Sequence, residues 1–447
     1  MIVMGGIVGA GIFANPSEVA HRVHTPFLIL GVWVLGGLIA MCGAFIWAEL
    51  ATRLPGTGGQ YLYLREAYHP SVAFVYGWGL LLVTQTGGMA AVAVIFSSYF
   101  RALTGVVWND SAIAAAVLVI LTGINCLGAR TGSNVQSALM LSKIGAIAIL
   151  VTIGFAVGQP ATARLESGAL LGQPASFGLL KSIGAAMVPI AFAYGGWQTA
   201  TFVAGEMRDA PRDLSRGLLI GVGGVVALYL AVNLACLRVL GPAGLDATTT
   251  PASDVMRIAL GERGAQWIAI AITISTLGFL SQSMLTAPRV YYAMARDGLF
   301  FSGVGRVFGK SGAPVVAIIL QGLAAIIIAC SGTYGEILNF EVTVDFIFFG
   351  MTAAALFILR QRNIGLARII YRAPGHPFTT TLFVLSCAGI VVSAVLASPG
   401  NSAIALSIML AALPVYYFWT RFKRAQSKKL SSGNTGSPPN ARARGLR

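Results

Sequence analysis

Two apolar segments of the chain are interrupted by glycine, and the interruptions could bind a zwitterion. The first is the run GGIVGAGIF at 5–13, and the second is FAYGGWQ at 192–198. Where a membrane helix breaks, the half-helix that begins there offers free N–H groups to a carboxylate, and the half-helix that ends there offers carbonyls to an ammonium. An amino acid carries both groups. The alternative is that these glycines only allow helices to pack closely.

Lys143, Glu341 and Asp345 are ionisable residues within apolar runs, where a charge at the helix centre costs about 3 kcal/mol. Lys143 is about eight residues, or roughly 12 Å of helix, from the expected cytoplasmic end near Val135. Its ammonium needs water, fixed acceptors, or a stem that reaches the interface. Glu341 and Asp345 are four residues apart and share a helix face. Asp345 is a candidate proton carrier or extracellular gate, unless it only faces a water-filled vestibule.

The cysteines and histidines do not form a recognisable site. The five cysteines lie in apolar segments without a CxxC pair, and the four histidines lie at helix ends or in loops. This pattern predicts neither a disulfide framework nor a zinc site. No GxxxxGK[ST] phosphate loop indicates an ATP-driven pump, and no repeat resembles a channel filter. We expect no metal or other cofactor. A membrane-embedded enzyme is less favoured, because it would need clustered acids, histidines or metal ligands.

The composition requires that most of the chain lies in lipid. Of 447 residues, 56% are hydrophobic and only 10% are charged. A membrane helix takes about 20 apolar residues. We predict twelve such segments, and therefore an all-α polytopic membrane protein. Their approximate ranges are 2–23, 27–50, 72–100, 112–127, 135–157, 177–203, 218–240, 267–285, 314–330, 337–359, 378–397 and 403–419.

The net charge of +15 is distributed as in a membrane protein, so we expect no nucleic-acid partner. With twelve spans and a cytoplasmic start, twenty-two of the 30 Lys and Arg residues fall on the cytoplasmic side. The positive-inside rule therefore predicts that both termini are cytoplasmic. The basic segment 422–447, rich in Ser, Gly and Pro, is predicted to be a disordered tail that lipid headgroups attract weakly.

The two glycine breaks fall in the first and the sixth predicted spans. Because five is an odd number, a repeat of spans 1–5 in spans 6–10 would be inverted in the membrane. Paired broken helices in two halves indicate a transporter binding site near the midplane. We predict a transporter domain over 1–421, with inverted repeats at about 1–157 and 177–359 and extra helices within 378–419.

Four motifs, taken together, resemble one family. They are GAGIF at 9–13, AELATRLPGTGGQYLYLREAY at 48–68, GEMRDAPRDL at 205–214 and AMARDGLF at 293–300, and FAYGGWQ supports them. With these motifs the chain resembles the amino acid, polyamine and organocation (APC) transporter superfamily, closest to its L-type amino acid transporter-like branch. The resemblance extends from Ile2 to Arg421. It implies a 5+5 inverted-repeat carrier that works by alternating access.

The resemblance also implies which residues hold the substrate. Backbone N–H groups of Ala10, Gly11 and Ile12 would meet the carboxylate, and carbonyls of Ile7, Phe192 and Gly195 would meet the ammonium. The Phe192 ring would gate the pocket and Trp197 would help to close its floor, unless these two rings only pack in the core or against lipid. Gln198 would form the edge of the pocket. Ala10 replaces a serine, and Gln198 an asparagine, that many relatives carry. Space near the pocket is expected at Gly87 and Gly88.

Lys143, in NVQSALMLSK at 134–143, is similar to a lysine that takes the place of a sodium ion in sodium-coupled relatives. We expect it to donate to carbonyls around Gly9 and to approach the eighth span near Ser281. The implied function is sodium-independent exchange or proton-linked uptake of amino acids.

Small neutral amino acids are favoured as substrates, because none of the proposed pocket positions supplies a fixed charge. The alternative within the same fold is a polyamine or amine permease. We expect a location in a bacterial inner (plasma) membrane. Only about eight residues, or roughly 12 Å of helix, precede the first break, so we also expect coding sequence upstream of Met1. The sequence indicates no oligomeric state.

Overall fold

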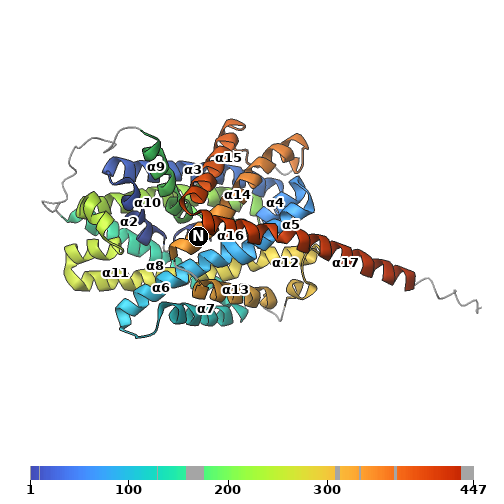
Figure 1. Cartoon of the computed structure of the whole chain (residues 1–447), viewed down its shortest axis with the longest axis horizontal. Helices are drawn as coiled ribbons and strands as arrows, with labels where there is room; N and C mark the ends of the chain where they lie inside the picture. Colours follow the sequence, from blue (N-terminus) through green and yellow to red (C-terminus); the bar gives the residue numbers. More distant parts are fainter. Residues whose placement is uncertain are drawn as a thin grey trace, which may run out of the picture.

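The computed structural model describes residues 2–9, 11–127, 129–157, 176–307, 313–331, 334–366 and 370–433. Its regular elements are all helices, and Figure 1 shows them gathered into one bundle. The elements are α1 Ile2–Ile7, α2 Gly11–Val23, α3 Pro26–Arg53, α4 Gln60–Ala67, α5 Pro70–Gly79, η1 Leu80–Thr84, α6 Gln85–Thr104, α7 Asp110–Cys126, α8 Ala129–Ala156, α9 Phe177–Tyr194, η3 Trp197–Glu206, α10 Ala210–Ala247, α11 Pro251–Thr286, α12 Pro288–Arg296, η4 Ser302–Gly305, α13 Val315–Ser331, α14 Tyr334–Gln361, α15 Phe378–Ala397, α16 Pro399–Leu410 and α17 Ala412–Gly433.

The helices confirm a multi-span membrane protein. Nine helical stretches of the described chain are long and apolar enough to cross a membrane, and the shorter apolar helices α7 and α13 accompany them. Each of the twelve predicted segments coincides with one of these helices or with a broken pair. The number twelve stays a prediction. The start of the tail differs from expectation, because α17 continues to Gly433 where disorder was predicted from residue 422. In Figure 1, α17 projects from the bundle.

Both predicted helix breaks are present. Helix α1 ends at Ile7 and α2 begins at Gly11, while α9 ends at Tyr194 and is followed by the 3₁₀ segment η3 from Trp197. The breaks touch each other: a Cβ added at Gly196 would lie 2.1 Å from the carbonyl oxygen of Gly6. Gly196 also has a φ of +96°, a conformation that favours glycine. Two segments nearly 190 residues apart in the chain are therefore held together by backbone contact.

Small residues of α3 allow other helices to approach it closely, as in many membrane proteins. A Cβ at Gly36 would lie 2.2 Å from Ile190 of α9, and one at Gly37 would lie 2.7 Å from Val226 of α10. The Trp33 ring packs edge-on against Tyr194, with ring centroids 5.6 Å apart. This packing fixes the C-terminal end of α9, which leads into the second break.

The segment 70–104 also departs from a regular α-helix. A π-helical turn, η1, separates α5 from α6 in a stretch that is otherwise apolar. Turns of this kind widen a helix locally and are frequent at functional sites. The turn places Thr84 and Gln85 on the wall of the cavity described below.

Candidate functional site

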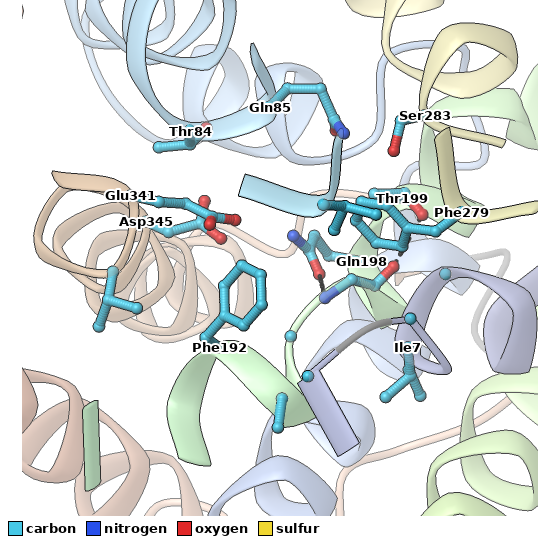
Figure 2. A pocket seen from close by; sticks show the side chains of 18 of the residues that line it. Ile7, Thr84, Gln85, Phe192, Gln198, Thr199, Phe279, Ser283, Glu341 and Asp345 are labelled. Carbon is cyan, nitrogen blue, oxygen red and sulfur yellow. Dashed lines mark hydrogen bonds between the residues drawn. The ribbon is translucent and has the colours of Figure 1, made fainter. Parts of the chain in front are cut away.

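A cavity lies where the two breaks meet (Figure 2). Its walls come from α1, α2, α9 and η3, and from η1, α6, α11 and α14 on the facing sides. It is lined by Gly6, Ile7, Gly9, Gly11, Leu80, Thr84, Gln85, Val92, Ala191, Phe192, Ala193, Gly195, Gly196, Gln198, Thr199, Phe279, Gln282, Ser283, Glu341, Val342, Asp345 and Phe346. Five of the residues proposed from the sequence for substrate binding line this cavity.

The N-terminus of α2 reaches the cavity at Gly11. The first N–H groups of a helix have no partner within it, so this end can bind an anion. Ile12 is the next residue, but its side chain is fully buried and it does not line the cavity. Ala10, the third position expected here, lies outside the described residues.

The C-terminal ends of α1 and α9 reach the same cavity at Ile7 and Phe192. The carbonyl oxygen of Ile7 accepts a hydrogen bond of 3.0 Å from the Tyr229 hydroxyl of α10. The carbonyl oxygen of Phe192 accepts one of 3.1 Å from the Gly195 N–H. Each carbonyl oxygen has a second lone pair, so an ammonium can still be accepted at this end.

The side chains of Gln198 and Thr199 hydrogen-bond to backbone groups of the second break. Its side-chain oxygen accepts a hydrogen bond of 3.0 Å from the Gly196 N–H. The Thr199 hydroxyl donates to the Gly196 carbonyl over 2.7 Å. These bonds satisfy backbone groups that the interruption of the helix would leave open. Both side chains border the cavity, as expected for Gln198 from the sequence.

The two aromatic residues expected at the pocket lie in different places. The Phe192 ring lines the cavity, and Figure 2 shows it between Asp345 and Gln198. Trp197 does not line the cavity. Its ring is 98% buried and packs edge-on against Trp47 of α3, with ring centroids 4.9 Å apart. Trp197 therefore packs against α3 on the side of the break that faces away from the cavity. It does not form the floor of the pocket, where we expect it from the sequence.

Lys143 is fully buried and lies outside the cavity, behind the first break. Its Nζ donates a hydrogen bond of 2.7 Å to the carbonyl oxygen of Val8. Its stem packs on α11, where a Cβ added at Gly278 would lie 2.8 Å from the Lys143 Cε. From the sequence we expected carbonyls around Gly9 and a neighbour near Ser281. The acceptor is one residue before Gly9, and the neighbour on α11 is about one turn before Ser281.

Glu341 and Asp345 reach the cavity from α14. Figure 2 shows both carboxyl groups pointing into it. Asp345 is 9% exposed. The Glu341 carboxyl packs against Gly88 of α6, where an added Cβ would lie 2.9 Å from its Oε1. The space expected at Gly88 is thus occupied by a carboxyl group. The expectation of neutral substrates rests on a pocket without ionisable side chains. This cavity has two of them, Glu341 and Asp345.

Comparison with known proteins decides the family. Residues 1–419 match the family described as amino acid permease. The chain belongs to this family. The serine/threonine exchanger SteT of Bacillus subtilis (strain 168) is 30% identical over 93% of this chain and 94% of its own length. The large neutral amino acids transporter small subunit 2 of Mus musculus is 27% identical over 93% and 78%. The b(0,+)-type amino acid transporter 1 of Rattus norvegicus is 27% identical over 96% and 88%.

The predicted membership of the APC superfamily is therefore confirmed, and with it an amino acid transporter rather than an enzyme. The permease is a multi-pass membrane protein, and the family implies a fold with paired broken helices. An amino acid is the substrate class that the family implies.

Several residues that line the permease cavity were not identified from the sequence. They are Thr84, Gln85, Thr199, Phe279, Gln282 and Ser283. The signal that could have found the first two is the polar run TQTGG at 84–88 in an apolar span, and SQS at 281–283 is a second. Polar residues within a span usually face the interior of the bundle. Phe279 has no such signal, because it is an apolar residue in an apolar helix.

Proposed function

We propose that this permease carries α-amino acids across the membrane by alternating access and recognises their amino and carboxyl groups through backbone at the two breaks. One observation carries the proposal: the N-terminus of α2 and the C-terminal ends of α1 and α9 border a single cavity. In an α-amino acid the positive ammonium and the negative carboxylate are bonded to the same Cα. The opposed helix ends supply the complementary dipoles.

The proposed architecture has twelve spans, with inverted repeats at about 1–157 and 177–359. The breaks after Ile7 and Tyr194 support this proposal, because each lies in the first span of its proposed repeat. The charge asymmetry supports cytoplasmic termini, and similarity to a protein of Bacillus subtilis supports a bacterial plasma membrane.

The proposed transport is independent of sodium. The Lys143 ammonium holds the Val8 carbonyl of the first break, and a fixed cation there leaves no need for a dissociable one. Exchange of one amino acid for another is favoured by the name of SteT, a serine/threonine exchanger. Proton-linked uptake is the second mode, and Asp345 is then the proposed proton carrier or extracellular gate, with the Phe192 ring as the gate over the substrate.

Small neutral amino acids are proposed as substrates, supported by the same relative. An amine permease is the second candidate, and the carboxyls of Glu341 and Asp345 on the cavity wall support it, because they would attract a cation. An amine would use the carbonyl ends of the breaks and leave the N-terminus of α2 empty.

The experiment that tests this proposal removes one recognition group at a time. Purified protein in proteoliposomes takes up labelled L-serine against competitors: L-serine methyl ester, which lacks the carboxylate, and 3-hydroxypropanoate, which lacks the ammonium. We expect unlabelled L-serine to compete and neither analogue to do so. Competition by the ester as strong as that by serine would show that the carboxylate is not recognised, and would contradict the proposal.

A further inference from the structure

The cavity wall formed by α14 carries two carboxyl groups that have no hydrogen-bond partner on another side chain in the part of the chain that the structure describes. Asp345 is nine-tenths buried, and among the described residues neither it nor Glu341 has a hydrogen bond or ion pair to another side chain. Oε2 of Glu341 is completely enclosed. No Lys, Arg or His is among the described residues that line the cavity. The buried ammonium of Lys143 lies outside the cavity and donates to the Val8 carbonyl.

This arrangement is costly unless something positive enters the cavity. Acidic side chains one helical turn apart repel each other, and an unpaired charge within a membrane protein is expensive. A metal ion is disfavoured, because the described chain has no group of three or more acidic, histidine or cysteine residues that could hold one. A proton or an organic cation remains.

The surroundings favour an organic cation. An ammonium has three N–H donors to satisfy. Besides the two carboxyls, the cavity offers the hydroxyl of Thr84, a buried group that has no hydrogen-bond partner in the described structure. Thr84 lies one helical turn before Gly88, the residue against which Glu341 packs. A proton needs none of these extra acceptors, and it needs no open space beside the carboxyls.

We propose that Glu341, Asp345 and Thr84 form a subsite for a positively charged group at the end of a substrate side chain. The permease then carries small neutral amino acids, whose side chains do not extend to the subsite, and among longer side chains it prefers those that end in an ammonium over neutral ones of the same chain length. This inference rests on the proposed function, because the α-amino and α-carboxyl groups must occupy the breaks.

The position of the subsite suits a distal group. Figure 2 shows the carboxyls on the opposite side of the Phe192 ring from Ile7 and Gln198, which mark the breaks. In this view the Phe192 ring lies beside the space between the breaks and Asp345. The face of an aromatic ring attracts cations as well as apolar groups. The path is therefore compatible with an aliphatic chain that ends in an ammonium.

The test compares amino acids that differ only in the terminal ammonium. L-ornithine and L-norvaline share a three-carbon side chain, and L-lysine and L-norleucine share a four-carbon one. Each is used to compete with labelled L-serine in proteoliposomes, and 1,4-diaminobutane is included as an amine without a carboxylate. In one pair or both, we expect the cationic member to inhibit serine uptake at a concentration about tenfold lower than the neutral member. That ratio corresponds to the free energy of a hydrogen-bonded charge pair.

Variants identify the groups responsible. Glu341→Gln and Asp345→Asn keep the shape and remove the charge, so each should reduce the preference within the pair by about tenfold. Glu262→Gln is the matched control, because that glutamate is 72% exposed and paired with Arg257. It should leave the preference unchanged.

A second pair of variants moves the carboxyl without removing it. In Gly88→Ala the new methyl lies 2.9 Å from Oε1 of Glu341, which must shift, whereas the methyl of Gly87→Ala lies 3.8 Å from its nearest neighbour, on Ile337. Because only the end of a flexible side chain is displaced, the fold should tolerate both. We expect the preference for the cation to fall about threefold or more in Gly88→Ala and to persist in Gly87→Ala.

The outcomes separate this inference from the function on which it rests. Equal competition by both members of each pair overturns the subsite while leaving amino acid transport intact. Variants that slow the uptake of all substrates equally, with the preference kept, assign the carboxyls to proton transfer and also overturn it. Competition by 1,4-diaminobutane equal to that by ornithine, or no transport of any amino acid, refutes the proposed function itself.

Discussion

The ammonium of Lys143 in α8 donates a hydrogen bond of 2.7 Å to the carbonyl oxygen of Val8, in the break between α1 and α2. The lysine is fully buried, and its stem also packs against α11 at Gly278. One side chain therefore connects the broken helix to two helices that surround it. The bond gives the Val8 carbonyl a partner where the helix provides none.

Replacing Lys143 by alanine should lower the rate of transport per molecule more than it lowers the amount of protein in the membrane. The Val8 carbonyl would lose its donor, at a cost of about 1–3 kcal/mol. Lys181→Ala is the control, since Lys181 is exposed near the start of α9. Uptake is measured in proteoliposomes at matched protein content. Normal uptake by Lys143→Ala would contradict the proposed role.

Replacing Gly11 by valine should abolish transport. A Cβ at this position lies 3.1 Å from the Cα of Ala193, and its branches would enter the site proposed for the carboxylate. Gly31→Val is a suitable control, because a Cβ there meets nothing within 4 Å. Uptake is compared at equal membrane abundance. Wild-type uptake by Gly11→Val would exclude this end of α2 from substrate binding.

Replacing Gly196 by alanine should prevent the two breaks from meeting. The new methyl would lie 2.1 Å from the Gly6 carbonyl oxygen, a backbone atom that a side-chain movement does not relieve. Gly105→Ala separates this clash from backbone strain, because Gly105 also has a positive φ but open space around it. Strain alone costs about 1–2 kcal/mol. We expect folded protein from Gly105→Ala and little from Gly196→Ala in size-exclusion chromatography; equal yields would contradict the close contact.

Replacing Glu49 by alanine should destabilise the protein strongly. This fully buried carboxylate accepts hydrogen bonds from Arg53 over 2.8 Å, from Arg360 over 2.5 and 3.0 Å, and from the Ala373 N–H over 2.8 Å. Removing one member of a buried ionic network costs about 3–5 kcal/mol.

Glu18→Ala is the control for Glu49→Ala, since Glu18 is 48% exposed and pairs with Arg22 at a cost of at most about 1 kcal/mol. Thermal unfolding in detergent measures both variants. A melting temperature for Glu49→Ala no lower than that for Glu18→Ala would show that the network contributes little.

The sequence predicted the membrane helices and the two breaks because their signals are local. Long apolar runs must be helical in lipid, and the glycines at 5–11 and 195–196 lie within the chain segment that they interrupt. The acceptor of Lys143 was expected around Gly9 from the family resemblance, since the residues alone also allowed water or a stem that reaches the interface; the structure has the Val8 carbonyl as the acceptor.

Long-range packing was not predictable. Trp197 lies beside the break in sequence, yet its ring packs between Trp47 and Phe349, away from the cavity. Glu341 and Asp345 could be assigned to one helix face, but no local pattern indicated that this face borders the breaks. That placement depends on how α14 packs against α6, η1 and α9, which involves contacts between distant parts of the chain.

The permease is proposed to transport amino acids independently of sodium. The most direct measurement is uptake of a labelled amino acid panel into proteoliposomes that contain only the purified protein, with and without unlabelled amino acid inside, in sodium and in choline buffer. We expect saturable uptake of at least one amino acid at the same rate in both buffers, accelerated by internal substrate if the permease exchanges. Uptake that requires sodium, or no uptake of any amino acid by folded protein, would contradict the account.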